Sequence, residues 1–157
     1  MQEGLIYGII ALMHKDFYAS GFLYHPKTQQ ILLQQVISAN IEPIWSMLGG
    51  ENLKNETSEA SFGRIIYKVL RIKIKPNNIF PVYTYFHSEK NIDHFICYAK
   101  ITKLEKFPNS KKSLFSWFTF KQIQKMNLPA QIKQDIIVGQ RVIQSSIRKG
   151  LGERTIE

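Results

Sequence analysis

Residues 49–72, GGENLKNETSEASFGRIIYKVLRI, constrain the fold of this chain more than any other stretch. Two adjacent glycines open it, and glycine permits both a positive φ and a close approach of other groups to the backbone. A polar loop follows, in which Thr57 or Ser58 can accept a hydrogen bond from an amide of a first helical turn. The order predicts a glycine turn, a polar loop and one long helix.

The helix predicted after this loop is amphipathic. Its apolar side chains recur every three or four residues, at Phe62, Ile65, Ile66, Val69 and Ile72. A basic strip lies beside them, formed by Arg64, Lys68 and Arg71. Pro76 ends the element, because proline has no amide hydrogen for a helical hydrogen bond.

The rest of the chain predicts a mixed order of strands and helices. Apolar and aromatic runs bounded by turn residues predict strands at residues 5–13, 17–24, 31–36, 44–48, 79–87, 92–103 and 114–119. HPKTQQ joins the second and third of these into one hairpin, and SEKN joins the fifth and sixth into another. A helical turn is predicted at residues 120–126. A last helix follows Pro129 over residues 130–149, with these side chains toward the core: Ile132, Ile136, Val142, Ile143 and Ile147.

Size and composition predict one globular domain. The chain has 157 residues, of which 44% are hydrophobic, and we place the domain at residues 1–150 with a flexible C-terminal tail at residues 151–157. The lone Cys97 excludes a disulfide framework and predicts a buried, unreactive thiol. The apolar run at residues 5–13 is too short to span a bilayer and has no basic segment before it. We therefore expect a cytoplasmic or otherwise soluble intracellular protein, without membrane insertion.

The chain is strongly basic. Lysine and arginine number 21 against 12 acidic residues, for a net charge of +9. This excess favours phosphate-bearing partners such as nucleotides, nucleic acid or an anionic membrane surface, unless it serves solubility alone. The basic residues are spread along the sequence rather than clustered, so the charge by itself selects none of these partners.

The spacing within residues 49–72 resembles the start of the Nudix box. Gly50, five residues, Glu56, seven residues and Arg64 follow that pattern, and the later aliphatic positions hold Ile66 and Ile72. SGFLYHPKTQQILLQQ is similar to the opening hairpin of the family, and SWFTFKQIQKMNLP to its late segment with Trp-Phe and Leu-Pro. The resemblance implies a fold of the α/β (α+β) class, a Nudix-like α/β/α sandwich with a mixed β-sheet.

The second half of the box departs from the family. Ile65 stands in place of a glutamate, Lys68 and Val69 replace a Glu-Glu pair, and the family's glycine is Arg71. In the family those glutamates hold a divalent metal against a pyrophosphate. An ammonium about 4 Å from a divalent ion opposes it by about 8 kcal/mol at an effective dielectric near 20. The resemblance thus implies a helix without metal, which also lacks its left-handed cap and runs on toward Lys73.

The retained box residues are those that a scaffold needs. Gly50 is expected to shape the turn, and Glu56 to pair with Arg64 across the loop. Lys68 can hold a phosphate directly, with Lys54 in the loop beside it, or it can simply face solvent. The resulting hypothesis is a non-hydrolytic module that binds a nucleotide or other phosphate-bearing ligand, RNA, or a protein partner.

A divergent hydrolase of nucleoside diphosphate derivatives is the alternative. Nudix enzymes recruit carboxylates from outside the box, and here the fallback catalytic residues are Glu51, Glu56 and Glu59. Such an enzyme needs Mg²⁺ or Mn²⁺, whereas the binding module needs no cofactor. For each carboxylate the alternative role is a solvated loop charge. Four aromatic residues either pack in the core or stack a base: Phe22, Trp45, Tyr83 and Tyr85.

Overall fold

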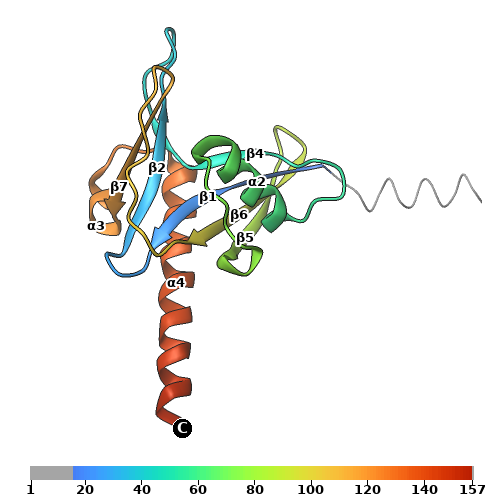
Figure 1. The fold of residues 1–157 in the computed structure, drawn as a ribbon. Helices are drawn as coiled ribbons and strands as arrows, with labels where there is room; N and C mark the ends of the chain where they lie inside the picture. The colour runs from blue at the N-terminus through green and yellow to red at the C-terminus, as the bar shows by residue number, and fades with distance from the viewer. Residues whose placement is uncertain (1–15, 157) are drawn as a thin grey trace, which may run out of the picture.

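The computed structural model describes residues 16–156, with helices α2 and α4 on opposite faces of a sheet (Figure 1). The predicted strand at residues 5–13 lies outside the described residues. The strands are β1 Phe17–His25, β2 Gln30–Val36, β3 Trp45–Ser46, β4 Leu48–Glu51, β5 Ile79–His87, β6 Ile92–Lys100 and β7 Ser113–Thr119. The helices are α2 Ser58–Leu70, α3 Phe120–Lys125 and α4 Ala130–Ile156, with a 3-10 turn, η1, at Pro76–Asn78.

The strands form one mixed sheet of seven strands. β1 and β6 run parallel at its centre, where Phe17 lies opposite Asp93 and Tyr24 opposite Lys100. The other pairs are antiparallel, in the order β3-β2-β1-β6-β5, with β4 added to β1 and β7 to β2. Both predicted hairpins form. The predicted α/β/α sandwich with a mixed sheet is therefore confirmed.

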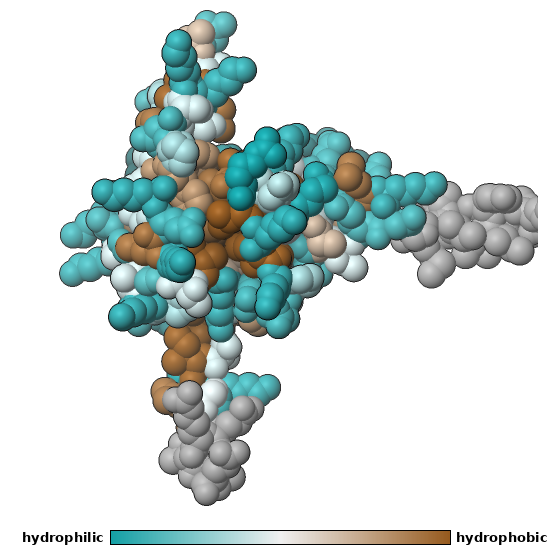
Figure 2. Space-filling view, in the orientation of Figure 1, coloured by the Kyte–Doolittle hydropathy of each residue, from teal (hydrophilic) through white to brown (hydrophobic). Residues whose placement is uncertain are grey.

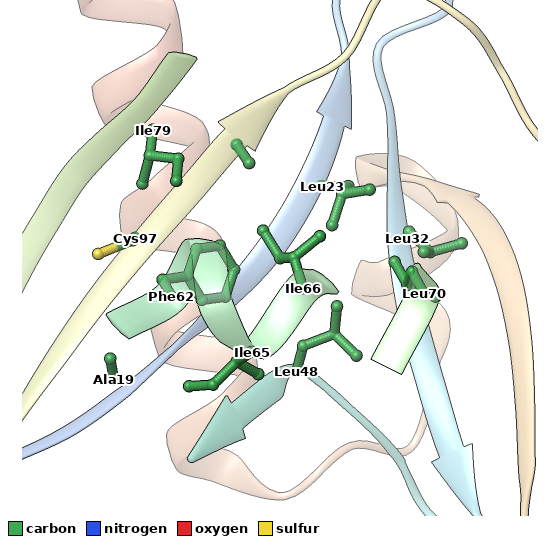
Figure 3. Close-up of a cluster of buried hydrophobic side chains, with 11 residues drawn as sticks. Ala19, Leu23, Leu32, Leu48, Phe62, Ile65, Ile66, Leu70, Ile79 and Cys97 are labelled. Atoms are coloured by element: carbon green, nitrogen blue, oxygen red, sulfur yellow. The ribbon is translucent and has the colours of Figure 1, made fainter. Parts of the chain in front are cut away.

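Each face of the sheet carries its own apolar layer. Along β1, Leu23 points toward α2 and Phe22 toward α4, because successive side chains of a strand leave opposite faces. Figure 3 shows the α2 layer, in which the ring of Phe62 lies over the sheet. Cys97 is buried in this layer, and burial raises the pKa of its thiol to about 12. The thiol is thus unreactive at neutral pH, as predicted.

Helix α2 begins as predicted but ends earlier. The Thr57 hydroxyl caps it by accepting a hydrogen bond of 3.1 Å from an amide of the first turn. The helix does not run on toward Lys73, because Arg71 itself takes the left-handed cap conformation, with a φ of 60°. The chain leaves the helix axis there because Ile72 and Ile74 pack against the core under α2.

The glycine pair serves close packing rather than a turn. Among the described residues no glycine has a positive φ, and Gly49 and Gly50 lie inside β4 rather than in the predicted turn. A Cβ on Gly49 would lie 2.8 Å from the Tyr18 ring, and one on Gly50 would lie 3.2 Å from Ile65. Both positions lack a side chain because their neighbours already fill that space.

Helix α4 crosses the other face of the sheet and projects beyond it (Figure 1). Ile136 and Ile143 are buried as predicted, but Ile147 is 48% exposed because the helix has passed the edge of the sheet there. The helix also continues to Ile156, past its predicted end at residue 149. The flexibility expected of residues 151–157 stays a prediction. In the described part of the chain, no helix combines the length and the apolar character that crossing a membrane requires.

Candidate functional site

The predicted pair of Glu56 and Arg64 holds the loop before α2. Arg64 Nε donates to Glu56 Oε2 at 2.9 Å, and Arg64 Nη2 donates to Oε1 at 3.1 Å. The Leu53 amide donates to the same Oε1 at 2.6 Å. Burial alone would raise the pKa of Glu56, but the hydrogen bonds from Arg64 and Leu53 outweigh it and keep that pKa below its usual value. Both oxygens of Glu56 are thus engaged within the protein.

The other two fallback carboxylates do not join Glu56. Glu51 is exposed at the end of β4. Glu59 lies in the first turn of α2, where it accepts a hydrogen bond of 3.1 Å from the Ser58 hydroxyl. Within the described part of the chain, no three His, Cys, Asp or Glu side chains gather as ligands for a metal ion. The structure therefore does not bring the fallback catalytic residues together.

The two predicted phosphate ligands face solvent. Lys68 lies on the outer side of α2, between the exposed Tyr67 and Val69. Lys54 is exposed in the loop before the helix. Ile65, on the same helix, points into the core instead (Figure 3). The outer side of α2 thus carries a lysine but no group of carboxylates.

A cleft of about 380 Å³ opens on the opposite face of the sheet from α2. Strands β1, β5 and β6 form its floor, and the first turns of α4 form one wall. Its polar groups come from segments far apart in the sequence: Tyr18, Ser20, Ser46, Tyr85, His87, Lys90, His94, Gln131 and Asp135. Apolar lining comes from Met47, Ile92 and Ile132. A concave site with apolar walls and a few fixed polar groups suits a small polar ligand.

His94 connects two hydroxyl groups across the floor of this cleft. Its Nε2 lies 2.8 Å from Ser20 Oγ, and its Nδ1 lies 2.8 Å from the Tyr85 hydroxyl. Burial lowers the pKa of His94 to about 4, and the nearby charges of His87 and Lys90 act in the same direction. The imidazole is therefore neutral at pH 7, so one of its nitrogens donates and the other accepts.

Asp135 is the buried carboxylate of the cleft, with 1% of its surface exposed. Its Oδ1 accepts hydrogen bonds from the Tyr83 hydroxyl and from Gln131 Nε2, the latter at 2.9 Å. Burial raises the pKa of Asp135, while these two hydrogen bonds oppose the rise. No donor among the described residues reaches Oδ2, although Asp135 lines the cleft. That oxygen is an acceptor ready for an N–H or O–H group of a ligand.

The sequence did not single out His94 or Asp135 as site residues. One signal was available for Asp135, since it lies between Ile132 and Ile136 on the inward side of the predicted last helix. Of the four aromatic candidates, Tyr85 lines the cleft and Tyr83 binds its carboxylate. The other two pack in the core on this side of the sheet: Phe22 and Trp45.

Solved structures share this arrangement of strands and helices. A MutT/nudix family protein from Enterococcus faecalis matches with a TM-score of 0.63 and 18% identity, over 83% of this chain and 62% of that one. The NUDIX domain of Shewanella oneidensis NrtR, in complex with ADP ribose, matches with a TM-score of 0.60 and 17% identity, over 82% of this chain and 86% of that one. A NUDIX hydrolase from Nitrosomonas europaea matches with a TM-score of 0.59 and 11% identity, over 81% and 89%. This chain has the Nudix fold.

At these identities the likeness establishes the Nudix fold alone. No protein-family model and no curated protein sequence matches the chain. The chain spans less than two thirds of the Enterococcus faecalis protein. In this Nudix-fold chain, the helix with the box-like spacing is α2, and the cleft that contains His94 and Asp135 lies across the sheet from it.

Proposed function

We propose that this Nudix-fold chain binds a nucleotide-type ligand in the Asp135 cleft and does not hydrolyse it. The observation that carries the proposal is a carboxylate buried in the wall of a cleft, with one oxygen still free to accept a hydrogen bond. The bound ADP ribose in the Shewanella oneidensis NUDIX domain supports this class of ligand. The absence of gathered carboxylates among the described residues supports binding without hydrolysis.

The cleft offers more than one kind of contact to such a ligand. Asp135 Oδ2 accepts from an amino or ring N–H group of a base, or from a sugar hydroxyl, and a hydrogen bond to a charged group is worth about 1.5–3 kcal/mol. Tyr18 and Tyr85 supply ring surface against which an apolar part of the ligand packs. His87, at the end of β5, and Lys90, in the turn that follows it, also line the cleft, and the ammonium of Lys90 can pair with a phosphate.

The divergent hydrolase is the alternative function, and the donor set does not fit the metal it needs. Mg²⁺ and Mn²⁺ take oxygen ligands in octahedral geometry, and the protein supplies carboxylate oxygens that are free to coordinate the ion. Both carboxylate oxygens of Glu56 already accept hydrogen bonds from Arg64 or from the Leu53 amide. Within the described residues, Glu56 forms no metal-binding group with Glu51 or Glu59. We therefore propose no cofactor for the binding module.

A thermal-shift series with ADP-ribose, nucleoside diphosphates and inorganic phosphate tests the cleft. The parent protein should gain thermal stability with a nucleotide-type ligand, since binding to the folded state raises the melting temperature. Asp135→Asn should lose this response, because one acceptor oxygen becomes an amide donor. Glu89→Gln, which removes an exposed carboxylate in the turn before β6, is the matched control. An equal response in both variants contradicts the proposed site.

Hydrolysis and the lysines of α2 are tested with the same ligands. Incubation with Mg²⁺ or Mn²⁺ should release no phosphate or nucleoside monophosphate. Turnover that disappears in Glu56→Gln or Glu51→Gln establishes the hydrolase instead. Lys68 and Lys54 stay our proposed phosphate contacts for a ligand that lies along α2. If Lys68→Glu loses the ligand-induced rise in melting temperature and Asp135→Asn keeps it, the ligand binds along α2. If Lys68→Glu keeps that rise, Lys68 does not contact the ligand.

A further inference from the structure

Basic residues that are spread along the sequence gather on the α2 side of the fold. Residues 68–75 and 100–106 contain seven lysines or arginines and one carboxylate, a net charge of +6 out of +9 for the whole chain. The antiparallel register of β5 and β6 pairs Ile79 with Ala99, so the residues before β5 lie alongside those after β6. These two flanking segments line a groove of about 330 Å³.

Both walls of the groove carry lysines on an anchored backbone. Lys73 and Lys75 line one wall, and Lys100 and Lys103 line the other. Three aliphatic residues between these lysines pack against the core under α2: Ile72, Ile74 and Ile101. Burial alternates along residues 71–75 as it does in an extended segment, whose alternate side chains lie about 6.6 Å apart. The lysines are therefore presented in register rather than on a free loop.

None of these four lysines forms an ion pair with a described residue. The ammonium of Lys100 lies 4.8 Å from the centre of the Phe80 ring, on the α4 side of the sheet, so Lys73, Lys75 and Lys103 are the cations that face the groove. The single carboxylate in the lining is Glu105, which leaves a net of two positive charges from Lys73, Lys75 and Lys103. Figure 2 shows hydrophilic side chains standing out from this face beside an apolar area. A concave surface with this charge attracts an extended polyanion.

We propose that this groove binds the backbone of single-stranded nucleic acid. Alternate lysines about 6.6 Å apart match every second phosphate of a stacked strand, which carries one charge per roughly 3.4 Å. Tyr67 lies beside the groove, 42% exposed, and Arg71 and Lys73 each approach its ring to 5.8 Å. An exposed ring beside a basic groove is the combination that single-strand binding surfaces use.

A membrane surface is the main alternative occupant of the groove, and the shape of the groove argues against it. A flat anionic membrane contacts the rim of a hollow rather than its interior. The groove shares no lining residue with the Asp135 cleft. It is therefore a site beyond the proposed nucleotide site, and either one can fail without the other.

Fluorescence anisotropy with a labelled oligo-dT of about 12 nucleotides tests the groove, since single-strand sites span about 4–16 nucleotides. Three phosphate contacts, from Lys73, Lys75 and Lys103, predict a slope of about −2.1 in log affinity against log salt, or about an 18-fold loss of affinity over a fourfold rise in salt. The Lys73→Gln/Lys103→Gln variant should reduce that slope to about −0.7. The Lys111→Gln/Lys112→Gln variant removes the same charge from an exposed loop outside the groove and should keep the parent slope.

Three results overturn the proposal. In the first, the parent protein fails to bind the oligonucleotide at low salt. In the second, the two double lysine variants lower the salt slope equally, which shows that net charge alone drives binding. In the third result, the parent protein binds phosphatidylserine vesicles and the Lys73→Gln/Lys103→Gln variant does not, although the variant still binds the oligonucleotide. That result assigns the groove to a membrane surface. Tyr67→Ala should weaken oligonucleotide binding about fivefold or more, and Tyr67→Phe should not, because a phenyl ring still stacks. Equal affinities of Tyr67→Ala and the parent remove Tyr67 from the site.

Discussion

The neutral state of His94 predicts that acid destabilises this protein through the floor of its cleft. The pKa of His94 is lowered from 6.5 to about 4, mainly by burial. As the pH falls below 6.5, His94 therefore becomes protonated in the unfolded chain while it stays neutral in the folded chain. The stability that His94 provides is fully present above pH 6.5 and is lost as the pH falls toward 4. Protonation also turns both ring nitrogens into donors, so whichever of the Ser20 and Tyr85 hydroxyls donates to the neutral ring can no longer do so.

The size of this effect follows from the two pKa values. A pKa difference of about 2.5 corresponds to about 3.4 kcal/mol at 1.36 kcal/mol per unit, of which about 2.6 kcal/mol is lost by pH 4.5. His94 is only partly buried, and solvent screening reduces this ceiling. We expect the parent protein to lose about 1–2 kcal/mol through His94 between pH 7.5 and pH 4.5.

Urea unfolding of the parent protein and His94→Gln, at both pH values, measures this loss. Glutamine keeps a polar group near Ser20 Oγ but does not titrate, so the variant should lose less stability in acid by the stated amount. The carboxylates and the other histidines titrate in both proteins, and their contributions cancel in the difference. Equal losses in the two proteins refute the reasoning. So does an NMR titration in which the His94 ring has its midpoint near 6.5.

Three further predictions concern helix α2, and each is checked by the free energy of unfolding in urea. Phe62→Ala should cost about 3–5 kcal/mol, because the ring is fully buried. Val69 is partly exposed, so Val69→Ala should change the stability by no more than about 0.5 kcal/mol. Similar losses in the two variants would contradict the packing of α2. Thr57→Ala should cost about 1 kcal/mol through loss of the N-cap, while Thr57→Ser should be neutral. Arg71→Gly should stabilise the protein by about 0.5–1 kcal/mol, because glycine relieves the left-handed strain at the C-cap. Destabilisation by Arg71→Gly would show that the contact of Arg71 with the Tyr67 ring outweighs that strain.

The parts of the fold that could be predicted are those with local signals. The two hairpins carry their turn residues and apolar strands within about 25 residues, and α2 carries its own cap at Thr57. The parallel pair of β1 and β6 has no such signal, since Phe17 meets Asp93, which lies 76 positions later in the sequence. The end of α2 was predicted too late, because a non-glycine residue, Arg71, takes the left-handed conformation. The packing of Ile72 and Ile74 against the core directs the chain away from the helix axis at that point.

The cleft could not be predicted for the same reason. Asp135 obtains its partner Tyr83 from a strand 52 residues earlier, and His94 obtains Ser20 from a strand 74 residues earlier. Neither pair has a recognisable spacing in the sequence, because the β1–β6 pairing and the placement of α4 create both contacts. The box-like spacing, by contrast, correctly predicted the contact of Glu56 with Arg64, which lie eight residues apart and share one loop and one helix.

The basic groove could be predicted in part, because two local sequence patterns combine to build it. A hairpin over residues 79–103 was predicted, and an antiparallel pairing of Ile79 with Ala99 directs residue 75 toward residue 103 whatever lies between. That register alone does not hold the flanks together beyond the last strand pair. The isoleucines that alternate with lysines in residues 71–75 do so, because Ile72 and Ile74 enter the core and leave the lysines outside. A period of two in a segment next to a hairpin is therefore enough to turn dispersed charge into a surface with spaced cations.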